Sequence, residues 1–259
     1  MSRPVAFVTG SSRGIGAGIA LEMAKAGYDL ALNYVNARDE AYKVKNEVES
    51  EGAKAVVIQG DISNLEDIDR MFIEYKNAYN QMDVMVNNAG ITVFGPFLEM
   101  TPEKWERITN TDWRGSYFCA QKAAQLMVEN GTKGTIINIT SNHQTGCWPI
   151  ASVYGPTKAA LNKFTQNAAL ELAPHGIRMV AIAPGYTRVR EMPENPPPEF
   201  QERRDKLFSR LPLGRMCEPW EVGKACVFLA SEGAGYITGT CLVMDGGAIL
   251  PVVPENVYN

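Results

Sequence analysis

The stretch Val5-Ala6-Phe7-Val8-Thr9-Gly10-Ser11-Ser12-Arg13-Gly14-Ile15-Gly16 decides the fold of this chain. It starts with an apolar, β-strand-like run and leads through a glycine-rich turn into an amphipathic stretch over residues 15–26. Glycines at positions 10, 14 and 16 allow a tight turn, a close backbone approach to a pyrophosphate, and close packing of a helix on a strand. The helix N-terminus offers free N–H groups to an anion. The placement of the glycines between a first strand and a first helix therefore predicts a phosphate cradle, with Ser12, Arg13 and Ile15 included.

Short β-branched runs alternate with longer amphipathic stretches along the rest of the chain. Strands are expected at residues 5–9, 30–33, 55–59, 84–87, 135–140, 178–183 and 240–244, and helices at 15–26, 38–51, 65–79, 102–129, 152–173 and 219–230. Repeated strand-helix-strand units predict a parallel sheet with helices on both faces. Right-handed crossovers make this a doubly wound, Rossmann-type α/β fold, with its ligand crevice at the carboxyl ends of the strands.

One segment interrupts this alternation. The 259 residues are expected to form a single domain over 1–259, yet residues 186–215 hold a cluster of prolines followed by a charged stretch at 199–210. A long insertion after the carboxyl end of a strand is a typical place for a substrate lid, so we predict a lid at 185–215 within the domain. A plain surface loop is the alternative.

The composition excludes several classes of protein. With 45% hydrophobic and 21% charged residues and a net charge of −4, the chain is typical of a globular protein without a basic footprint for nucleic acid. No apolar run approaches the ~18 residues of a membrane span, and the start Met1-Ser2-Arg3-Pro4 shows no signal core, so we expect a cytoplasmic protein without a membrane partner. Five widely spaced cysteines and two histidines indicate no metal site.

The end of the second predicted strand indicates which dinucleotide the cradle prefers. NAD-selecting proteins place a carboxylate there, about 20 residues beyond the glycines. This chain has Asn33-Tyr34-Val35-Asn36 instead, without an acid. Arg13 can face a 2′-phosphate, and we count Asn36 among the cofactor residues. The sequence therefore favours NADP(H), leaves NAD(H) possible, and has a solvated Arg13 as the alternative.

Tyr154 and Lys158 lie four residues apart on one face of a predicted helix. An adjacent ammonium group favours the phenolate form of a tyrosine, which makes Tyr154 a usable general acid/base. Ser141, at the carboxyl end of the preceding strand, can return to the same place and hydrogen-bond a substrate oxygen as charge develops. Together with the cradle, these residues predict hydride transfer between the nicotinamide and a secondary alcohol or carbonyl.

On these residues and the motifs given next, the chain resembles the common short-chain dehydrogenase/reductase family over nearly all of its length. The matching motifs are 9–16, 60–62, 87–90, Ser141 with Tyr154 and Lys158, 184–185 and 245–247. The resemblance implies that Asp61 binds the adenine amino group, that Ile62 packs on the ring, and that Lys158 holds the nicotinamide ribose. It also implies contacts to the cofactor from Asn88, Ala89, Gly90, Pro184, Gly185 and Thr187, and a homotetramer joined through the helices 102–129 and 152–173.

Three positions depart from the family pattern. Family members usually carry an Asn that binds a relay water three residues before Gly115, and this position holds Asp112. Asp112 could hold the same water, and its charge would pair with Lys158 or raise the lysine pKa. It could equally mark an impaired enzyme, so Asp112 is a candidate relay member only. Val180 replaces a frequent Asn, and Val189 replaces a frequent Thr, for which Thr187 is a candidate substitute.

The loop between Ser141 and Tyr154 must border the reacting carbon. His143, Gln144 and Trp148 offer hydrogen bonds and an aromatic wall, and Tyr186 follows the next strand. This stretch resembles that of the glucose dehydrogenases in the family, which favours a sugar or polyol as the small-molecule substrate. A turn-capping His143 and a Trp148 packed under the lid are the alternatives.

Two other functions stay open. A 3-oxoacyl carrier-protein reductase or another ketoreductase would need basic residues for an acidic carrier, and the expected positions hold Thr135 and His175, although lid arginines such as Arg188 and Arg190 leave an anionic substrate open. A non-catalytic cofactor-binding sensor or scaffold is the alternative of another class. The intact Ser141, Tyr154 and Lys158 argue against it.

Overall fold

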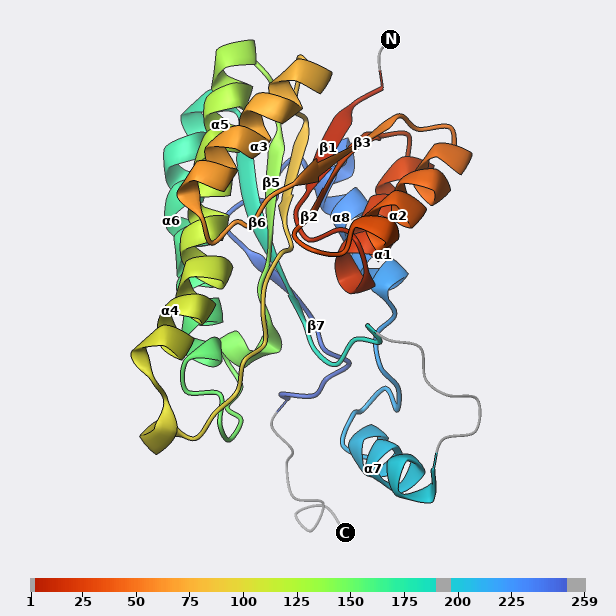
Figure 1. The fold of residues 1–259 in the computed structure, drawn as a ribbon, viewed down its shortest axis with the longest axis vertical. Helices are drawn as coiled ribbons and strands as arrows, with labels where there is room; N and C mark the ends of the chain where they lie inside the picture. The colour runs from red at the N-terminus through yellow and green to blue at the C-terminus, as the bar shows by residue number, and fades with distance from the viewer. Residues whose placement is uncertain (1–2, 190–196, 251–259) are drawn as a thin grey trace.

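The computed structural model describes residues 3–189 and 197–250, and it confirms the doubly wound α/β fold (Figure 1). Seven strands form one parallel sheet in the order β3-β2-β1-β4-β5-β6-β7. The direction of strand addition reverses between β1 and β4, which creates a crevice at their carboxyl ends. The strands are β1 (Val5–Val8), β2 (Asp29–Tyr34), β3 (Ala55–Gln59), β4 (Val84–Asn87), β5 (Thr135–Ile139), β6 (Arg178–Pro184) and β7 (Cys241–Met244).

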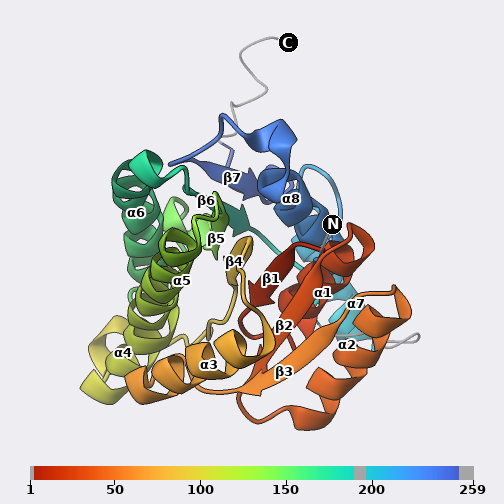
Figure 2. The same ribbon diagram turned by 90° about the horizontal axis from the view of Figure 1, so that it is seen from above.

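Helices cover both faces of the sheet (Figure 2). α1, α2 and α8 lie on one face, and α3, α5 and α6 lie on the other. The α-helices are α1 (Gly14–Lys25), α2 (Arg38–Ser50), α3 (Leu65–Ala78), α4 (Pro102–Thr109), α5 (Ser116–Asn130), α6 (Tyr154–Leu172), α7 (Pro198–Phe208) and α8 (Pro219–Ala230). All predicted strands and helices are present with bounds within two residues of the prediction, except that the helix over 102–129 is divided.

A π-helical turn, Asn110–Gly115, divides that helix into α4 and α5. Gly115 lies against the loop after β3, where a Cβ atom would come 2.3 Å from the carbonyl oxygen of Ile62. Turns of this kind inside α-helices occur mostly as single turns, frequently at functional sites. This one carries Asp112.

The helix expected over 152–173 begins two residues later than expected, as α6 at Tyr154. The N-cap is Val153, whose carbonyl oxygen accepts the N–H of Thr157 at 3.0 Å, and Ser152 is exposed. Pro156 is the third residue of the helix, in the first turn, where a missing N–H costs little. Tyr154 is therefore the first residue of α6, with Lys158 one turn further on.

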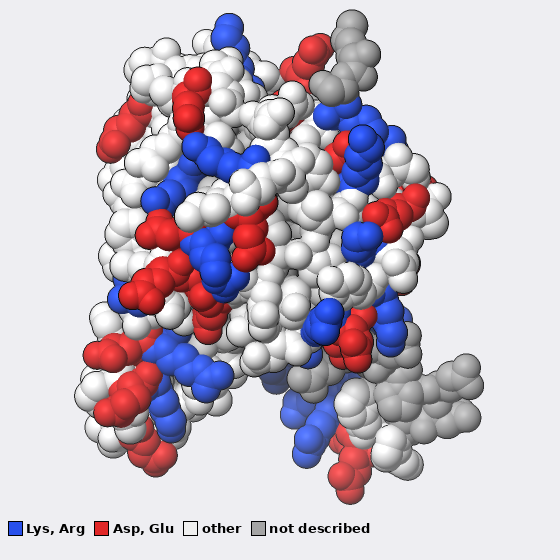
Figure 3. Space-filling model, turned by 45° about the horizontal axis from the view of Figure 1, so that its top comes forward, with Lys and Arg blue, Asp and Glu red and all other residues white. Residues whose placement is uncertain are grey.

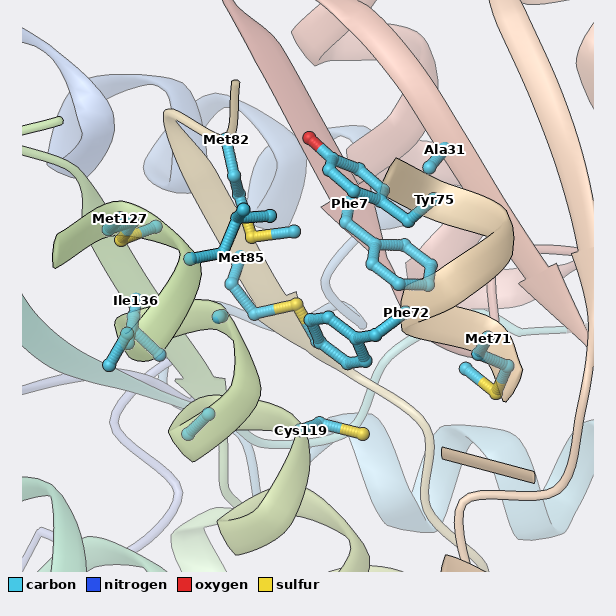
Figure 4. Close-up of a cluster of buried hydrophobic side chains, with 14 of the residues drawn as sticks. Phe7, Ala31, Met71, Phe72, Tyr75, Met82, Met85, Cys119, Met127 and Ile136 are labelled. Carbon is cyan, nitrogen blue, oxygen red and sulfur yellow. The ribbon is translucent and has the colours of Figure 1, made fainter. Parts of the chain in front are cut away.

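A hydrophobic core fills each side of the sheet. Figure 4 shows part of the core beneath α3 and α5, where Phe7 stacks on Tyr75 with ring centroids 5.3 Å apart. Met71, Met82 and Met85 fill the space around these rings. Flexible methionine side chains suit irregular gaps of this kind. The two cores fix the helices on the sheet and with them the loops at its carboxyl edge.

The predicted lid region contains a helix that the sequence analysis did not anticipate. α7 lies beyond the carboxyl ends of the strands and apart from the sheet (Figure 1), and it contains no buried residue. Arg190 and the prolines Pro193 and Pro196 of this region lie outside the described residues.

The surface carries mixed charge on the face shown in Figure 3, where acidic and basic side chains are interspersed. No helix in the described ranges 3–189 and 197–250 is long and apolar enough to cross a bilayer. Among the same residues, no group of His, Cys, Asp and Glu side chains could hold a metal ion.

Candidate active site

The candidate site residues meet at the carboxyl edge of the sheet. The glycine-rich turn follows β1, Asp61 follows β3, Asn88 follows β4, Ser141 follows β5, and Gly185 follows β6. The carboxyl ends of parallel strands share one edge, so five segments distant in sequence line the same crevice.

The glycine turn has the shape of a phosphate cradle. Gly10 and Gly14 have φ angles of 61° and 57°, a region that favours glycine. A Cβ on Gly16 would lie 2.3 Å from the carbonyl oxygen of Gly10. α1 begins at Gly14 without a side-chain cap on its first turn and without an acid there, so its N–H groups are open to an anion. The half-buried Ser12 and Ile15 belong to the same turn. The cradle therefore fits a dinucleotide pyrophosphate.

Two asparagines, the buried Asn33 and the half-buried Asn88, hold this turn in place. Asn33 accepts the N–H of Gly10 through Oδ1 at 3.0 Å and donates to the carbonyl oxygen of Gly60 at 2.9 Å. Asn88 donates to the carbonyl oxygens of Thr9 and Gly10 at 2.9 and 3.1 Å. The sequence analysis included Asn88 but treated Asn33 only as a missing acid. An amide side chain within an otherwise apolar predicted strand was the feature of the sequence that could have identified Asn33.

The adenosine end of the crevice is formed by the ends of β2 and β3. Arg13 and Asn36 are exposed, and the guanidinium of Arg13 makes no hydrogen bond or ion pair with any other described residue. Asp61 accepts the N–H of Ser63 through Oδ1 at 2.8 Å. Ile62 is 2% exposed and belongs to the core, which leaves little of its side chain for a ring to pack on.

Tyr154 lies beside Lys158, and His143 lies between Ser141 and Tyr154. Ser141 caps a short 3-10 turn, Asn142–Gln144, and its Oγ accepts the N–H of His143 at 3.2 Å. The imidazole of His143 meets the ring of Tyr154 edge to face, with centroids 5.2 Å apart. The Nζ of Lys158 lies 5.6 Å from the centroid of the Tyr154 ring. These contacts link Ser141 to Tyr154 through His143, and Tyr154 to Lys158 directly.

Asp112 forms a buried ion pair with Lys158. Its Oδ2 lies 3.1 Å from Nζ of Lys158, and its Oδ1 accepts the N–H of Ile91 at 2.8 Å. Lys158 also donates to the carbonyl oxygen of Ile139 at 3.3 Å. Burial lowers the pKa of Lys158, but the charges of Asp112 and Tyr154 more than offset this effect, so the pKa is raised above its usual value. The lysine is a cation at neutral pH.

Aromatic rings pack beside Tyr154 and His143. Trp148 stacks on His143 with centroids 3.9 Å apart, and its indole N–H donates to the hydroxyl of Tyr186 at 3.2 Å. Phe94 lies edge-on to Tyr154 at 5.9 Å. Burial lowers the pKa of His143, so its imidazole is neutral at pH 7. The sequence analysis missed Phe94, which follows the Asn-Asn-Ala-Gly motif closely.

A pocket of about 550 Å³ opens beside these rings, lined in part by Phe97, Trp148 and Pro156. His143 and Gln144 also line it, and Gln144 donates through Nε2 to the sulfur of Cys241 at 3.2 Å. The pocket is both polar and aromatic, and its dimensions suit a small organic molecule.

The segment after β6 closes the end of the crevice beside β6 and β7. A Cβ on Gly185, which follows Pro184, would lie 2.7 Å from the Cβ of Asp245. Thr187 donates through Oγ1 to the carbonyl oxygen of Gly185 at 3.2 Å. Val189 packs over Gly14, where an added Cβ would lie 3.4 Å from the valine side chain. The segment from Pro184 to Val189 therefore runs from Asp245, just after β7, to the glycine turn after β1.

A phosphate cradle beside a Ser, Tyr and Lys group at the switch point of a doubly wound sheet defines a dinucleotide-dependent oxidoreductase. The chain belongs to the short-chain dehydrogenase/reductase family. A family model described as enoyl-(acyl carrier protein) reductase matches residues 10–248. The protein is accordingly an NAD(P)-dependent oxidoreductase that acts on CH–OH groups and the corresponding carbonyls.

Its relatives differ in their substrates. The chain is 36% identical over 241 residues to an L-rhamnose 1-dehydrogenase (NAD(P)(+)) of Sphingomonas sp. (strain SKA58), covering 93% of this chain and 94% of that protein. It is 35% identical over 242 residues to a 3-oxoacyl-[acyl-carrier-protein] reductase FabG of Staphylococcus aureus (strain N315), covering 93% and 96%. An acetoin dehydrogenase structure from Enterobacter cloacae has a TM-score of 0.88 and 35% identity, covering 98% of each chain.

Proposed function

We propose that Ser141, Tyr154 and Lys158 catalyse the reaction and that Asp112 supports Lys158. The observation that carries this proposal is the contact between Tyr154 and the buried, charged Lys158 at the mouth of the crevice. Tyr154 protonates the substrate oxygen during reduction and accepts its proton during oxidation. The Oγ of Ser141 already accepts one N–H, which leaves its own hydrogen free to donate to the same oxygen.

The proposed cofactor is NADP(H), with NAD(H) as the weaker ligand. When bound, the cofactor supplies or accepts the hydride. The cradle residues Gly10–Gly16 hold the pyrophosphate, and Lys158 has a third N–H donor for ribose hydroxyls beyond those directed at Asp112 and Ile139. The exposed, unpartnered Arg13 and the neighbouring Asn36 favour a 2′-phosphate. Further proposed contacts come from Asp61, Ile62, Asn88, Ala89, Gly90, Pro184, Gly185 and Thr187.

The proposed substrate is a sugar or polyol. His143, Gln144, Trp148 and Tyr186 combine hydrogen-bonding groups with flat apolar surfaces, an arrangement suited to hydroxyl-bearing carbon chains. The likeness to a rhamnose dehydrogenase supports this class. A lid at 185–215 would cover the substrate within one domain spanning 1–259.

A 3-oxoacyl carrier-protein reductase is the second candidate, favoured by the likeness to FabG. Thr135 and His175 do not count against this candidate, because they lie at the amino ends of β5 and β6, at the opposite edge of the sheet from Ser141. Thr135 is also buried and accepts a hydrogen bond from Arg178. The residues at these two positions are therefore no evidence for or against the binding of an acidic carrier at the cleft of the same chain. A cofactor-binding sensor remains the alternative of another class.

We also propose a cytoplasmic homotetramer that binds neither nucleic acid nor membrane. A groove of about 560 Å³ between α5 and α6 is lined by Trp113, Tyr117 and Phe164. Phe118 and Phe164 pack partly against the core, whereas Leu170 is 77% exposed. A second copy of the chain would cover this face.

A substrate panel tests the proposed function. Purified protein is titrated with NADPH and NADH by fluorescence, and aldoses, polyols, acetoin and 3-oxoacyl thioesters are then added while cofactor absorbance is followed. Turnover of sugars or polyols, with NADP(H) preferred, is the expected result. Turnover of thioesters alone would establish the second candidate, and cofactor binding without any turnover would favour the sensor.

A further inference from the structure

The ion pair between Asp112 and Lys158 is the most deeply buried charged group in the described residues. Asp112 is 0% exposed and Lys158 is 4% exposed, less than any other charged residue in residues 3–189 and 197–250. The structure therefore places one negative and one positive charge together in a region of low polarity. Their sum is zero.

The position of this pair makes its charge matter to a bound cofactor. A Cβ on Gly90 would lie 3.1 Å from Oδ2 of Asp112 and 3.2 Å from Nζ of Lys158. Gly90 has no side chain, so the loop after β4 separates the pair from the crevice by backbone alone. His143, whose ring meets that of Tyr154 edge to face, is neutral at pH 7. Asp112 and Lys158 therefore dominate the local field.

The two forms of the cofactor differ in charge at the reacting ring. The oxidised nicotinamide ring carries a positive charge, and the reduced ring is neutral. During alcohol oxidation, the substrate carbon transfers a hydride to the ring, and the substrate hydroxyl transfers its proton to Tyr154. A lone lysine cation would repel the oxidised ring, and this repulsion is strong where the local dielectric constant is low.

We propose that Asp112 shifts the cofactor preference of the site toward the oxidised form by cancelling the charge of Lys158. This inference rests on the proposed function, in which Lys158 holds the nicotinamide ribose. An asparagine at position 112 could still accept the N–H of Ile91 but would leave Lys158 uncompensated. Asp112 is thus a positioning residue that acts through Lys158 on the relative affinities of the two cofactor forms.

The test compares dissociation constants of the oxidised and reduced cofactor in the wild type and in Asp112→Asn. Both are measured by calorimetry and fluorescence on cofactor-free protein, at slightly acidic pH so that Lys158 stays protonated. We expect the oxidised form to bind about tenfold more weakly in the variant, while binding of the reduced form changes little; a factor of ten corresponds to about 1.4 kcal/mol. Circular dichroism verifies the fold.

Three further variants separate charge from structure. Glu106→Gln removes an equal charge from the exposed surface of α4 and should leave the ratio of the two constants unchanged. Asp112→Glu should retain most of the wild-type ratio. Lys158→Gln should shift the ratio in the opposite direction, which keeps the proposal testable if Asp112→Asn does not fold.

The outcomes are distinct. An unchanged ratio in folded Asp112→Asn, or equal weakening of both cofactor forms, would overturn the proposal and assign Asp112 a structural role. If the wild type binds neither form, the proposed function itself fails.

Discussion

Tyr154 is the residue on which the proposed chemistry depends most directly. Tyr154→Phe keeps the ring and its contacts with His143 and Phe94 but removes the ionisable hydroxyl. We expect the turnover rate to fall by at least about 10²-fold, the lower range for loss of general acid/base catalysis, while cofactor affinity stays near that of the wild type. Steady-state kinetics and a fluorescence titration measure the two quantities.

The matched control is Tyr236→Phe, which removes the same hydroxyl from a fully exposed tyrosine ring. Because Tyr236 lies before β7, outside the pocket beside Tyr154, this change should alter neither turnover nor melting temperature. Substantial activity in Tyr154→Phe would remove Tyr154 from the catalytic role.

Arg13 should determine the choice between the two dinucleotides. It is exposed and unpartnered among the described residues, so Arg13→Ala has little structural cost. We expect NADPH affinity to fall about tenfold, which is about 1.4 kcal/mol and near the lower limit for a hydrogen bond to a charged group, while NADH affinity hardly changes. An equal loss for both cofactors would make Arg13 a general cation without a role in selection.

Single residues were predictable from sequence where local spacing defines their role. The four-residue interval between Tyr154 and Lys158 and the glycine positions of the cradle are local patterns. Asn33 and Phe94 act through long-range contacts, to Gly10 and to Tyr154, which no local pattern contains. The ion pair between Asp112 and Lys158 was one of the expected alternatives, because a carboxylate at position 112, where the family usually has an Asn, can pair with a lysine.

The π-helical turn Asn110–Gly115 connects the two ends of the crevice. Asp112 pairs with Lys158, while Arg114 donates to the carbonyl oxygen of Ser63 at 2.7 Å in the loop after β3. We expect Arg114→Gln to weaken cofactor binding about threefold, consistent with one partly screened, charge-assisted hydrogen bond. Turnover at saturating cofactor should stay constant.

A comparison of the cofactor dissociation constant with the turnover rate checks this prediction. Lys104→Gln, which removes an exposed cation from the neighbouring α4, is the control. A fall in turnover at saturating cofactor would contradict a role limited to the adenosine end.

The N-terminus of α8 carries a pH-sensitive ion pair. Arg215 binds both carboxylate oxygens of Glu221 at 2.7 and 2.8 Å, and Glu221 accepts the N–H of Glu218. The hydrogen bond from Arg215 is the largest cause that lowers the pKa of Glu221, from 4.5 to about 2. Because the folded-state pKa is the lower one, this stabilisation is complete above pH 4.5 and disappears as the pH falls to about 2.

Glu221→Gln should therefore lower the free energy of unfolding by about 0.5–1 kcal/mol at neutral pH, a range that allows for screening at this partly exposed ion pair. Denaturant titrations across the acid range should show the difference between the two proteins shrinking below pH 4.5. A difference independent of pH would contradict the assigned ion pair.

Elements were predictable where hydrophobic periodicity is continuous. β3, β4 and α8 have the bounds that the sequence predicts, because apolar runs or caps mark both of their ends. The π-helical turn was not predictable, since its wider geometry depends on the contact of Gly115 with Ile62. α7 was missed because its charged sequence buries no residue and so shows no apolar face.

At the scale of the whole molecule, the strand order follows from the repeated units and the handedness of their connections. The same order gathers the five site segments at one edge. The assembly of several copies could not be predicted in this way, because a sequence shows apolar residues on a helix without showing which of them pack in the core. The structure separates Phe118 and Phe164, which contact the core, from the exposed Leu170.

The exposed face of α5 and α6 leads to a prediction about assembly. If a second copy covers this face, Leu170→Glu introduces a charge into an apolar contact, and the homotetramer should dissociate into smaller species as the protein is diluted. The melting temperature should then depend on protein concentration, because association stabilises the folded state by mass action. Ile73→Glu, at a 62% exposed position on α3, is the matched control and should leave the assembly intact. Analytical ultracentrifugation of the three proteins measures the effect, and an unchanged mass for Leu170→Glu would show that the copies meet through another face.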